Sequence, residues 1–549
     1  MSVALLASSC GAWAQQLPGA GGQLQQIPPS PTPPRAPPEI RIEPRAAPAA
    51  PAADQARIVV NSLRVTGATL YSEAELVALT GFVAGAQLSL SDMQAMAARI
   101  TEHYRRNGYF VAQAYLPAQE IKDNAVTIAV SEGRYGNVTL KNESRLSDGL
   151  ARGLLGGLNS GDIISNAPLE NRLLLLSDLP GVNVRSTLVP GAAQGTSDLI
   201  VDVTPGQSVT GSVDADNAGN RYTGAYRIGA TVNVNNPLGQ GDVASLRVLT
   251  SGNGLKYARA SYQMQFGKLQ AGVAFSKLDY SLGKEFAPLG AHGTAEIASV
   301  YGRYPLIRSR SDNLYLLSEF DAKSFHDVVD ATSSVADRKS HVLSAGVAGD
   351  HRDNVAGGGL TAYSLTLAAG NLDIQTPSVR AQDAITARSN GSFQKLSFYG
   401  MRLQSLGGPL SIYAAINGQL ASKNLDISEK MELGGMNAVR AYPEGEAFGD
   451  EGFVATVEAR WDLAKFTGPV PGQVQLIAFM DHGSVTSNKR PWTGGDNRRS
   501  LSAAGVGAVW SDPGNFMVRV YYAHKLGNDP AISAPDRSGR FWIQAVKYF

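Results

Sequence analysis

The stretch FVATVEARW, residues 453–461, alternates in polarity along most of its length. In a β-strand, Phe453, Val457 and Trp461 would share one apolar face, whereas Glu458 and Arg460 would share the other. Full charges at mid-strand suit a wall that has lipid on one side and water on the other. The stretch therefore predicts a strand of a transmembrane β-barrel.

The same alternation recurs from about residue 208 onward, for example in KYARASYQMQF (256–266) and NFMVRVYYAHK (515–525). A soluble β-sandwich also alternates. Here, however, the polar face repeatedly carries charges, and no helical rhythm interrupts the segments. The 59 glycines also favour turns and strands. We predict an all-β transmembrane barrel of about 16 antiparallel strands over residues 207–549.

Two smaller units precede this region, and each reads β-α-α-β-β. In the first unit, 57–133, Ser91 and Gln94 match a capping box that opens a helix, whose apolar face repeats at helical spacing. In the second unit, 134–206, a leucine stripe over 169–179 marks the buried side of a helix. The order of elements repeats although the residues differ, which predicts two related α+β domains.

The N-terminal region has a different composition. Residues 1–14 resemble a secretory signal peptide whose start is truncated, with cleavage after Ala14 favoured over lipidation of Cys10. Residues 15–56 are rich in proline and predict an extended linker. Because Cys10 is the one cysteine in the sequence, a disulfide framework and a cysteine metal site are excluded.

Several phrases occur in an order that resembles the outer-membrane transporters of two-partner secretion, the TpsB family of ShlB/FhaC/HecB type. In that family the two N-terminal units are polypeptide-transport-associated (POTRA) domains. The phrases are RRNGY (105–109), LLLLSDLPGVNV (173–184), NNPLGQGD (235–242), DHRDN (350–354), GGMNAVRAYPEGEAFGDEG (434–452) and FMDHG (479–483). The closing segment GRFWIQAVKYF (539–549) also resembles the C-terminal signature of outer-membrane barrels, from which Lys547 departs.

The resemblance implies a functional loop. The family's V-R-G-Y motif lies at the tip of a long loop folded into the barrel, and its arginine reaches the acidic residue of an F-x-D-x-G motif on the wall. Strand alternation in VQLIAFMD (474–481) independently points Asp481 toward the lumen. The matching residues are Val439, Arg440, Tyr442, Phe479, Asp481 and Gly483.

Ala441 replaces the family's glycine. If that position required a positive φ, alanine would carry strain of about 1 kcal/mol. The loop's other charges could either pair with lumen arginines such as Arg460 or Arg519, or remain solvated. The supporting charges that we consider are Glu444, Glu446, Asp450, Glu458 and Arg460.

The resemblance implies a monomeric outer-membrane transporter, with its POTRA domains in the periplasm, that translocates a large secreted exoprotein and aids its activation or folding. The POTRA domains would bind the exoprotein's N-terminal secretion domain, and periplasmic chaperones and the barrel-assembly machinery would serve biogenesis. A net charge of +1 gives no support for nucleic-acid binding. The sequence shows no nucleophile elbow, phosphate-binding loop or metal spacing, so we expect neither an enzyme nor a cofactor.

Two alternatives remain open. A barrel-assembly or insertase relative would share the loop motif, although such proteins usually carry more than two POTRA domains. A passive porin or a plugged receptor would lack the N-terminal units or would need a long plug domain.

Overall fold

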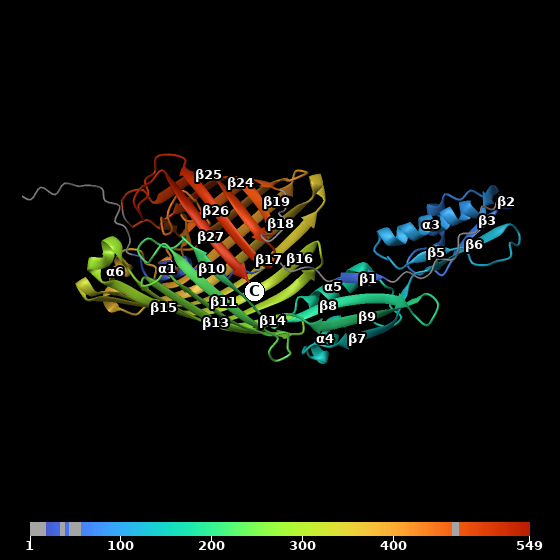
Figure 1. The fold of residues 1–549 in the computed structure, drawn as a ribbon, viewed down its shortest axis with the longest axis horizontal. Helices are drawn as coiled ribbons and strands as arrows, with labels where there is room; N and C mark the ends of the chain where they lie inside the picture. Colours follow the sequence, from blue (N-terminus) through green and yellow to red (C-terminus); the bar gives the residue numbers. More distant parts are fainter. Residues whose placement is uncertain (1–17, 33–38, 43–55, 464–470, 493) are drawn as a thin grey trace, which may run out of the picture.

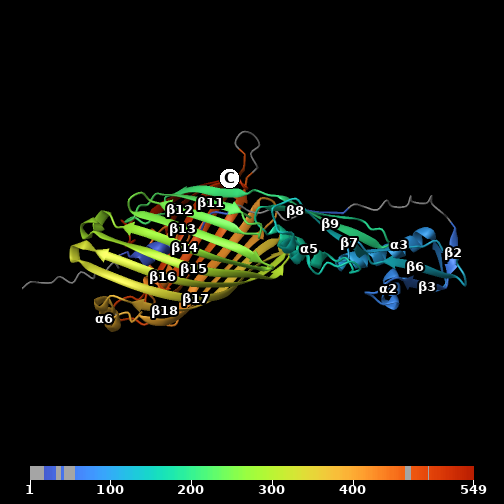
Figure 2. The same ribbon diagram turned by 90° about the horizontal axis from the view of Figure 1, so that it is seen from below.

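The computed structural model describes residues 18–32, 39–42, 56–463, 471–492 and 494–549. The molecule is elongated: a barrel occupies one end, and two small domains follow in a row beyond its rim (Figure 1). A view turned by 90° shows the same arrangement (Figure 2). The expected signal peptide at 1–14 lies outside the described residues.

Within the described residues, sixteen antiparallel strands close into a barrel, which confirms the predicted fold class. The ring follows chain order, and β27 pairs back onto β10. The strands are β10 (Val209–Asp216), β11 (Arg227–Asn235), β12 (Val243–Thr250), β13 (Leu255–Phe266), β14 (Leu269–Ser281), β15 (Ala291–Arg308), β16 (Asp312–Val329), β17 (Ser334–Asp353), β18 (Gly359–Ile374), β19 (Gly391–Ser405), β20 (Leu410–Ala421), β23 (Glu451–Asp462), β24 (Gln473–Thr486), β25 (Arg498–Asp512), β26 (Phe516–Lys525) and β27 (Gly539–Tyr548).

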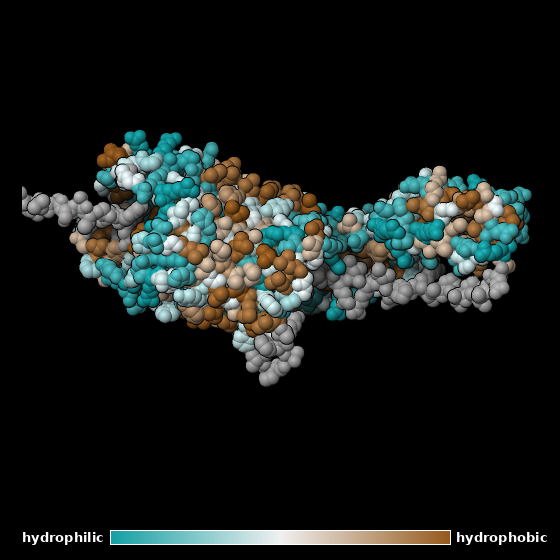
Figure 3. All heavy atoms as spheres, turned by 90° about the horizontal axis from the view of Figure 1, so that it is seen from above, coloured by the Kyte–Doolittle hydropathy of each residue, from teal (hydrophilic) through white to brown (hydrophobic). Residues whose placement is uncertain are grey.

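The barrel wall has the predicted polarity. On β23, Val457 and Trp461 are 52% and 55% exposed on the outside, whereas Glu458 faces inward and is 5% exposed. An apolar band covers the outer surface of the barrel beside the small domains (Figure 3). The period of two along each strand therefore separates a lipid-facing surface from a polar lumen.

The first unit packs two helices on a small sheet. The sheet order is β3-β6-β5, and β2 pairs separately with β4. Its core contains the fully buried Tyr104 and Ile100 of α3. The elements are β2 (Arg57–Val60), β3 (Ser62–Thr66), α2 (Glu73–Thr80), β4 (Ala86–Ser89), α3 (Leu90–Arg106), β5 (Gln113–Tyr115) and β6 (Ala125–Ser131).

The predicted helix start at Ser91 and Gln94 is wrong by two residues. Ser89 caps α3, because its hydroxyl accepts a hydrogen bond from the Asp92 amide and the Asp92 carboxylate accepts one from the Ser89 amide. The carboxylate of Asp92 therefore takes the role that the sequence motif assigned to a glutamine.

The second unit has the predicted β-α-α-β-β order. The leucines of α5 lie in its core, including the fully buried Leu169 and Leu176. The elements are β7 (Arg134–Asn142), α4 (Asp148–Leu155), α5 (Asn166–Ser177), β8 (Val182–Pro190) and β9 (Thr196–Pro205).

The proline-rich region contains two elements that the linker prediction missed. A short strand, β1 (Glu39–Ile42), adds in parallel to β8, so that the second sheet has the order β1-β8-β9-β7. A short helix, α1 (Ala20–Gln25), lies inside the barrel (Figure 1). Residues 15–56 are thus not a uniform extended spacer.

The remaining helices lie in the connections between barrel strands. Helix α6 (Pro377–Ile385) lies at the end of the barrel opposite the small domains (Figure 1). The 3-10 turns are η1 (Lys284–Leu289), η2 (Asp330–Thr332), η3 (Val355–Gly357) and η4 (Ile427–Glu429). No helix among the described residues has the length and apolar character needed to cross a membrane.

Candidate functional site: a long loop held inside the barrel

The connection between β20 and β23 runs from residue 422 to 450, so it begins earlier than the expected 434–452. It contains η4 and a small hairpin formed by β21 (Met431–Glu432) and β22 (Phe448–Gly449). Most of its residues are buried, and its contacts are with inward-facing side chains of the wall. The loop therefore folds into the lumen rather than away from the barrel.

Arg440 at the loop tip is bound to two carboxylates of the wall. Its Nε and Nη2 donate to the Asp481 carboxylate of β24 at 2.8 and 2.7 Å, and its Nη1 donates to Glu458 Oε1 of β23 at 2.8 Å. Arg440 and Asp481 are 5% and 2% exposed. Burial lowers the pKa of Arg440, but Asp481 and Glu458 outweigh that effect and raise it above the ordinary value. The guanidinium is therefore permanently charged and fully paired.

Aromatic side chains complete the site of Arg440. Its guanidinium carbon lies 3.4 Å from the ring centre of Phe479 and 5.0 Å from that of Tyr521. The indole N–H of Trp542 donates to the Arg440 carbonyl at 2.6 Å. Cation–π contacts of this kind gain strength where water is excluded, so the loop tip is fixed through both its side chain and its backbone.

The other motif residues pack around this contact. Val439 and Tyr442 are fully buried, and the Tyr442 hydroxyl donates to the Asp529 carbonyl at 3.1 Å. A side chain on Gly483 would stand 2.5 Å from Leu433 of the loop, so glycine at this wall position permits the loop to approach. The structure thus brings all six motif residues into one cluster; their role in transport stays a prediction.

Ala441 adopts no positive φ and is fully buried. The strain that we considered for this position is therefore absent. The backbone at 441 is one that any L-residue can adopt, so the tip tolerates the replacement of the family's glycine.

The acidic residues of the loop have other partners than Arg460 or Arg519. Glu446 is ion-paired with Arg499 of β25 and also accepts from the backbone of Ile532 and Ser533. Asp450 is paired with Lys430 at 2.9 Å within the loop. Arg460 instead donates to Glu458 at 2.7 Å, which places it behind the Arg440 contact.

The loop is also bound to a second part of the wall, formed by β16, β17 and β19. Glu429 of η4 lies between Lys323 of β16 and Lys395 of β19, with contacts of 2.8 and 2.7 Å. Asp426 accepts from Arg338 of β17 at 2.6 Å. Burial raises the pKa of the Glu429 carboxyl, but the two lysines outweigh burial and leave it below the ordinary value. The sequence motifs did not single out these residues.

Helix α1 packs against the same part of the loop. The Gln25 side-chain amide donates to the Ile427 carbonyl at 2.7 Å, and the Ala20 amide donates to Asp327 of β16 at 2.8 Å. Asp327 is in turn paired with Arg338, the partner of Asp426. Arg338 of the wall therefore links the carboxylate that binds α1, Asp327, to the carboxylate of the loop, Asp426.

Two loop carboxylates lie close together beneath the end of α1. Glu432 accepts from the Gly445 amide and, at 3.4 Å, from the Gln26 side chain, while Glu444 accepts from the Met436 amide at 2.8 Å. Burial raises the pKa of Glu444 to about 7, and burial together with the Glu444 charge raises the pKa of Glu432. Both shifts favour the protonated, uncharged form, which reduces the repulsion between the two groups.

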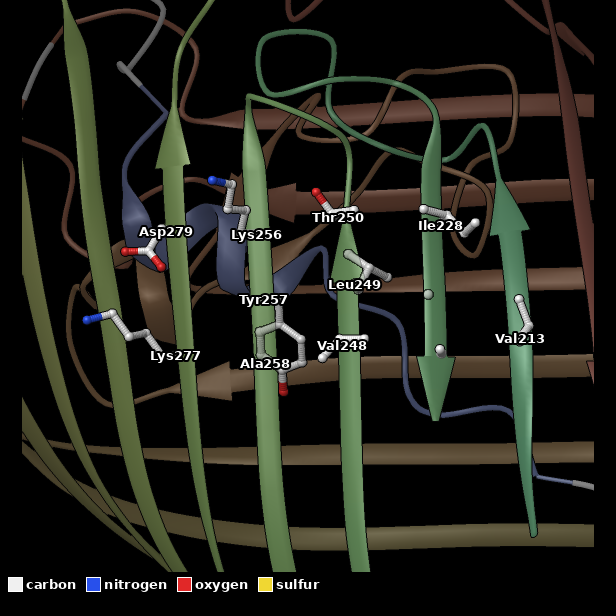
Figure 4. Close-up of a pocket in the computed structure, with 12 residues that line it drawn as sticks. Val213, Ile228, Val248, Leu249, Thr250, Lys256, Tyr257, Ala258, Lys277 and Asp279 are labelled. Carbon is white, nitrogen blue, oxygen red and sulfur yellow. The ribbon is translucent and has the colours of Figure 1, made fainter. Parts of the chain in front are cut away.

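A pocket of about 500 Å³ lies elsewhere, on the outer face of β10–β14 (Figure 4). Its exposed apolar walls, which include Val213, Ile228 and Val248, belong to the lipid-facing surface. Across the part of the chain that the structure describes, no group of three or more His, Cys, Asp or Glu residues is placed to hold a metal ion.

Comparison with known proteins identifies the family. Residues 195–509 match the family described as haemolysin secretion/activation protein ShlB/FhaC/HecB, and residues 58–133 match the ShlB-type POTRA domain. The heme/hemopexin transporter protein HuxB of Haemophilus influenzae is 32% identical over 474 residues, which cover 85% of this chain and 82% of HuxB. The outer membrane transporter CdiB of Escherichia coli O6:K15:H31 is 23% identical, over 89% of this chain and 82% of CdiB.

Solved structures share the fold. CdiB from Escherichia coli superposes with a TM-score of 0.69 at 21% identity, over 92% of this chain and 94% of that one. BamA from Haemophilus ducreyi, which lacks POTRA domains 1–3 in that structure, gives a TM-score of 0.55 at 14% identity, over 90% and 100% of the two chains. The family match favours a secretion transporter over an insertase, since the likeness to BamA is one of fold. The chain belongs to the ShlB/FhaC/HecB family and is an outer-membrane transporter of two-partner secretion.

Proposed function

We propose that this transporter exports one large exoprotein, whose N-terminal secretion domain is held in the periplasm by the two POTRA domains. We further propose that the loop of residues 422–450 closes the pore between transport events. In this proposal, the contact between Arg440 and Asp481 holds the loop in its closed position, and Glu458, Glu446 and their arginine partners stabilise that position.

The observation that carries the proposal is the buried attachment of Arg440 to Asp481 and Glu458. Burying three charges is costly unless each is paired, and breaking one partner leaves an uncompensated charge. Such a contact has a well-defined closed state and a steep cost for partial opening. A gate requires these properties. A contact that never opens would not need buried charges, since apolar side chains could fill the same space.

We propose that the chain works as a monomer and without catalysis of its own. The family consists of secretion transporters, and folding of the client outside the cell supplies a driving force that needs no nucleotide site. Chaperones and the barrel-assembly machinery act on this chain during its own biogenesis. Support for these points comes from the family and from the lumen residues, which are engaged in ion pairs rather than arranged around a reactive group.

The test is a deletion of the gene followed by comparison of the proteins in the culture medium. We expect one large protein to disappear from the medium and to return when the wild-type gene is restored. A tagged N-terminal fragment of that protein should co-purify with the transporter. Because one relative is named for heme/hemopexin transport, growth on heme and hemopexin belongs in the same comparison. An unchanged set of secreted proteins would refute the proposal.

A further inference from the structure

Three sequence phrases that the loop site does not use meet at one place, the joint between the second POTRA domain and the barrel. LLLLSDLPGVNV (173–184) supplies the domain's side of the joint. NNPLGQGD (235–242) forms the turn between β11 and β12, and DHRDN (350–354) lies at the end of β17. Because the three segments lie together, we can ask whether they attach the domain to the barrel, a role that the loop contact does not explain.

The first contact is an ion pair between Arg308, at the end of β15, and Asp178, directly after α5. The Arg308 Nε and Nη2 atoms donate to the two carboxylate oxygens of Asp178 at 2.7 and 2.8 Å. The side chains are 16% and 41% exposed. The Asn171 side chain donates to the Arg308 carbonyl at 2.9 Å, and the Arg310 amide donates to Glu170 at 2.6 Å. The joint thus combines a bidentate pair with backbone contacts.

Arg308 is also held from the barrel side. Its Nη1 donates to the Asn313 side-chain oxygen at 2.9 Å, and the Asn313 amide group donates to Asp350 of the DHRDN phrase at 3.0 Å. The guanidinium is therefore oriented before it meets Asp178. Orientation by a second layer of hydrogen bonds reduces the freedom that the pair would otherwise have to lose.

A second contact lies on the turn between β11 and β12. The Ser147 amide donates to the Gly239 carbonyl at 2.7 Å. Gly239 and Gly241 have φ of 77° and 62°, and a side chain on Gly241 would stand 2.9 Å from Leu179. These glycines are required both for the shape of the turn and for its close approach to the domain. A body attached at two separate points can turn only about the line that joins them.

We propose that these contacts are a fixed mount, and that Arg308 is a positioning residue for transport. The mount holds the second POTRA domain at one orientation against the turns of β11–β12 and β15–β16. A client held by the POTRA domains is then presented to the pore along one path. This inference rests on the proposed binding of the client by the POTRA domains.

The first experiment compares Arg308→Ala and Asp178→Ala with the surface variant Arg152→Ala, whose side chain is 70% exposed. Since a charge-assisted contact changes an equilibrium about tenfold, we expect secretion to fall about tenfold in the first two variants alone. Co-purification with the client fragment and insertion of the barrel should stay at wild-type levels. Normal secretion by Arg308→Ala would overturn the proposal, and so would a loss of client capture by that variant.

The second experiment replaces the ion pair by a covalent bridge. Asn171→Cys and Ser309→Cys introduce two thiols across the joint, and a short bismaleimide links them in cells. The link takes over the contact with the Arg308 carbonyl that Asn171 loses, and the unlinked double variant serves as the control. If the mount is fixed, the linked transporter secretes normally, and linking restores secretion to the Arg308→Ala variant. If linking stops secretion, the joint has to open during transport and the proposal is wrong. Failure of the wild type to capture the client would instead refute the proposed function.

Discussion

Gly21 of α1 packs directly against Ser428 of the long loop: a Cβ on Gly21 would stand 2.8 Å from the Cβ of Ser428. Two Cβ atoms cannot approach so closely, so the seating of the helix depends on this glycine. We predict that Gly21→Ala lifts α1 from the loop and raises the conductance of the purified protein in planar bilayers. Gly19→Ala is the matched control, because its Cβ would meet Asp327 at an ordinary 3.4 Å. Equal conductance in both variants would contradict the prediction.

Arg440→Ala leaves Asp481 and Glu458 buried without their cation. Removing one partner of a buried ion pair costs about 3–5 kcal/mol, so we expect the loop to leave its closed position while the barrel still inserts. A loop that is no longer fixed to the wall lies in the path of the client, so we expect secretion to fall. Arg440→Lys should recover little, because an ammonium group cannot replace the two-pronged contact with Asp481. Secretion and heat-modifiable migration on gels measure the two effects. Arg519→Ala serves as control, since Arg519 makes a long 3.4 Å contact with Asn437.

Ala441→Gly restores the family's residue but should not stabilise this protein. The backbone at 441 has no positive φ, so glycine would relieve no strain and would lose more conformational freedom on folding. We predict a loss of about 0.5–1 kcal/mol. Thermal unfolding in detergent checks this value, and an increased midpoint would show that alanine is strained after all.

Glu429→Gln tests the attachment of the loop to β16 and β19. The variant leaves Lys323 and Lys395 facing a neutral amide, and their mutual repulsion should loosen η4. We expect faster hydrogen exchange over residues 422–430, with the Arg440 contact intact. Glu451→Gln is the control, because Glu451 pairs with the 40% exposed Lys489, where water screens the charge. Similar exchange in the two variants would assign no anchoring role to Glu429.

The Glu432 and Glu444 pair predicts a dependence of pore closure on pH. Both pKa values are raised in the closed loop, that of Glu444 to about 7 from an ordinary 4.5. The closed state therefore holds its proton more tightly than an open one. Its extra stability is fully present below about pH 4.5 and is lost as the pH rises through about 7. Conductance should rise over this range in the wild type.

Glu432→Gln together with Glu444→Gln keeps the shapes of both side chains but removes both titrating groups, so the conductance of this double variant should stay low and flat with pH. Arg227 and Asp216 from the wall and Gln26 from α1 face the same pair and remain unchanged. A pH response that persists in the double variant would have to come from another group.

The period of two along a strand was enough to place Asp481 and Glu458 in the lumen and Trp461 in the lipid, because the two faces of a wall strand meet different solvents. The contact of Arg440 with Asp481 needed the family resemblance, since the residues lie 41 positions apart. The partners of Glu446 and Asp450 could not be predicted, because they depend on the depth to which the loop folds. The inward position of Trp542 could have been predicted from the sequence, because alternation along the strand puts Trp542 on the lumen side and Phe541 and Ile543 on the lipid side.

Helix α1 carries no comparable signal. Its sequence AGGQLQ is short and contains two glycines, which disfavour a helix in isolation. It forms because the lumen supplies partners for its backbone and apolar side chains, including Asp327 and the cluster around Leu249. Local propensity is uninformative where tertiary contacts supply the stability.

The pairing of β27 with β10 sets a condition on how this protein can be made. The two strands stand at opposite ends of the barrel sequence and share five paired positions, whereas β16 and β17 share 18. Any chain that lacks β27 leaves the hydrogen-bonding groups on the β27 side of β10 unpaired in hydrocarbon, which costs several kcal/mol per group. Truncated or clipped products therefore cannot persist as leaky, half-built pores in the membrane. The pairing of β27 with β10 thus protects the cell envelope from incomplete pores.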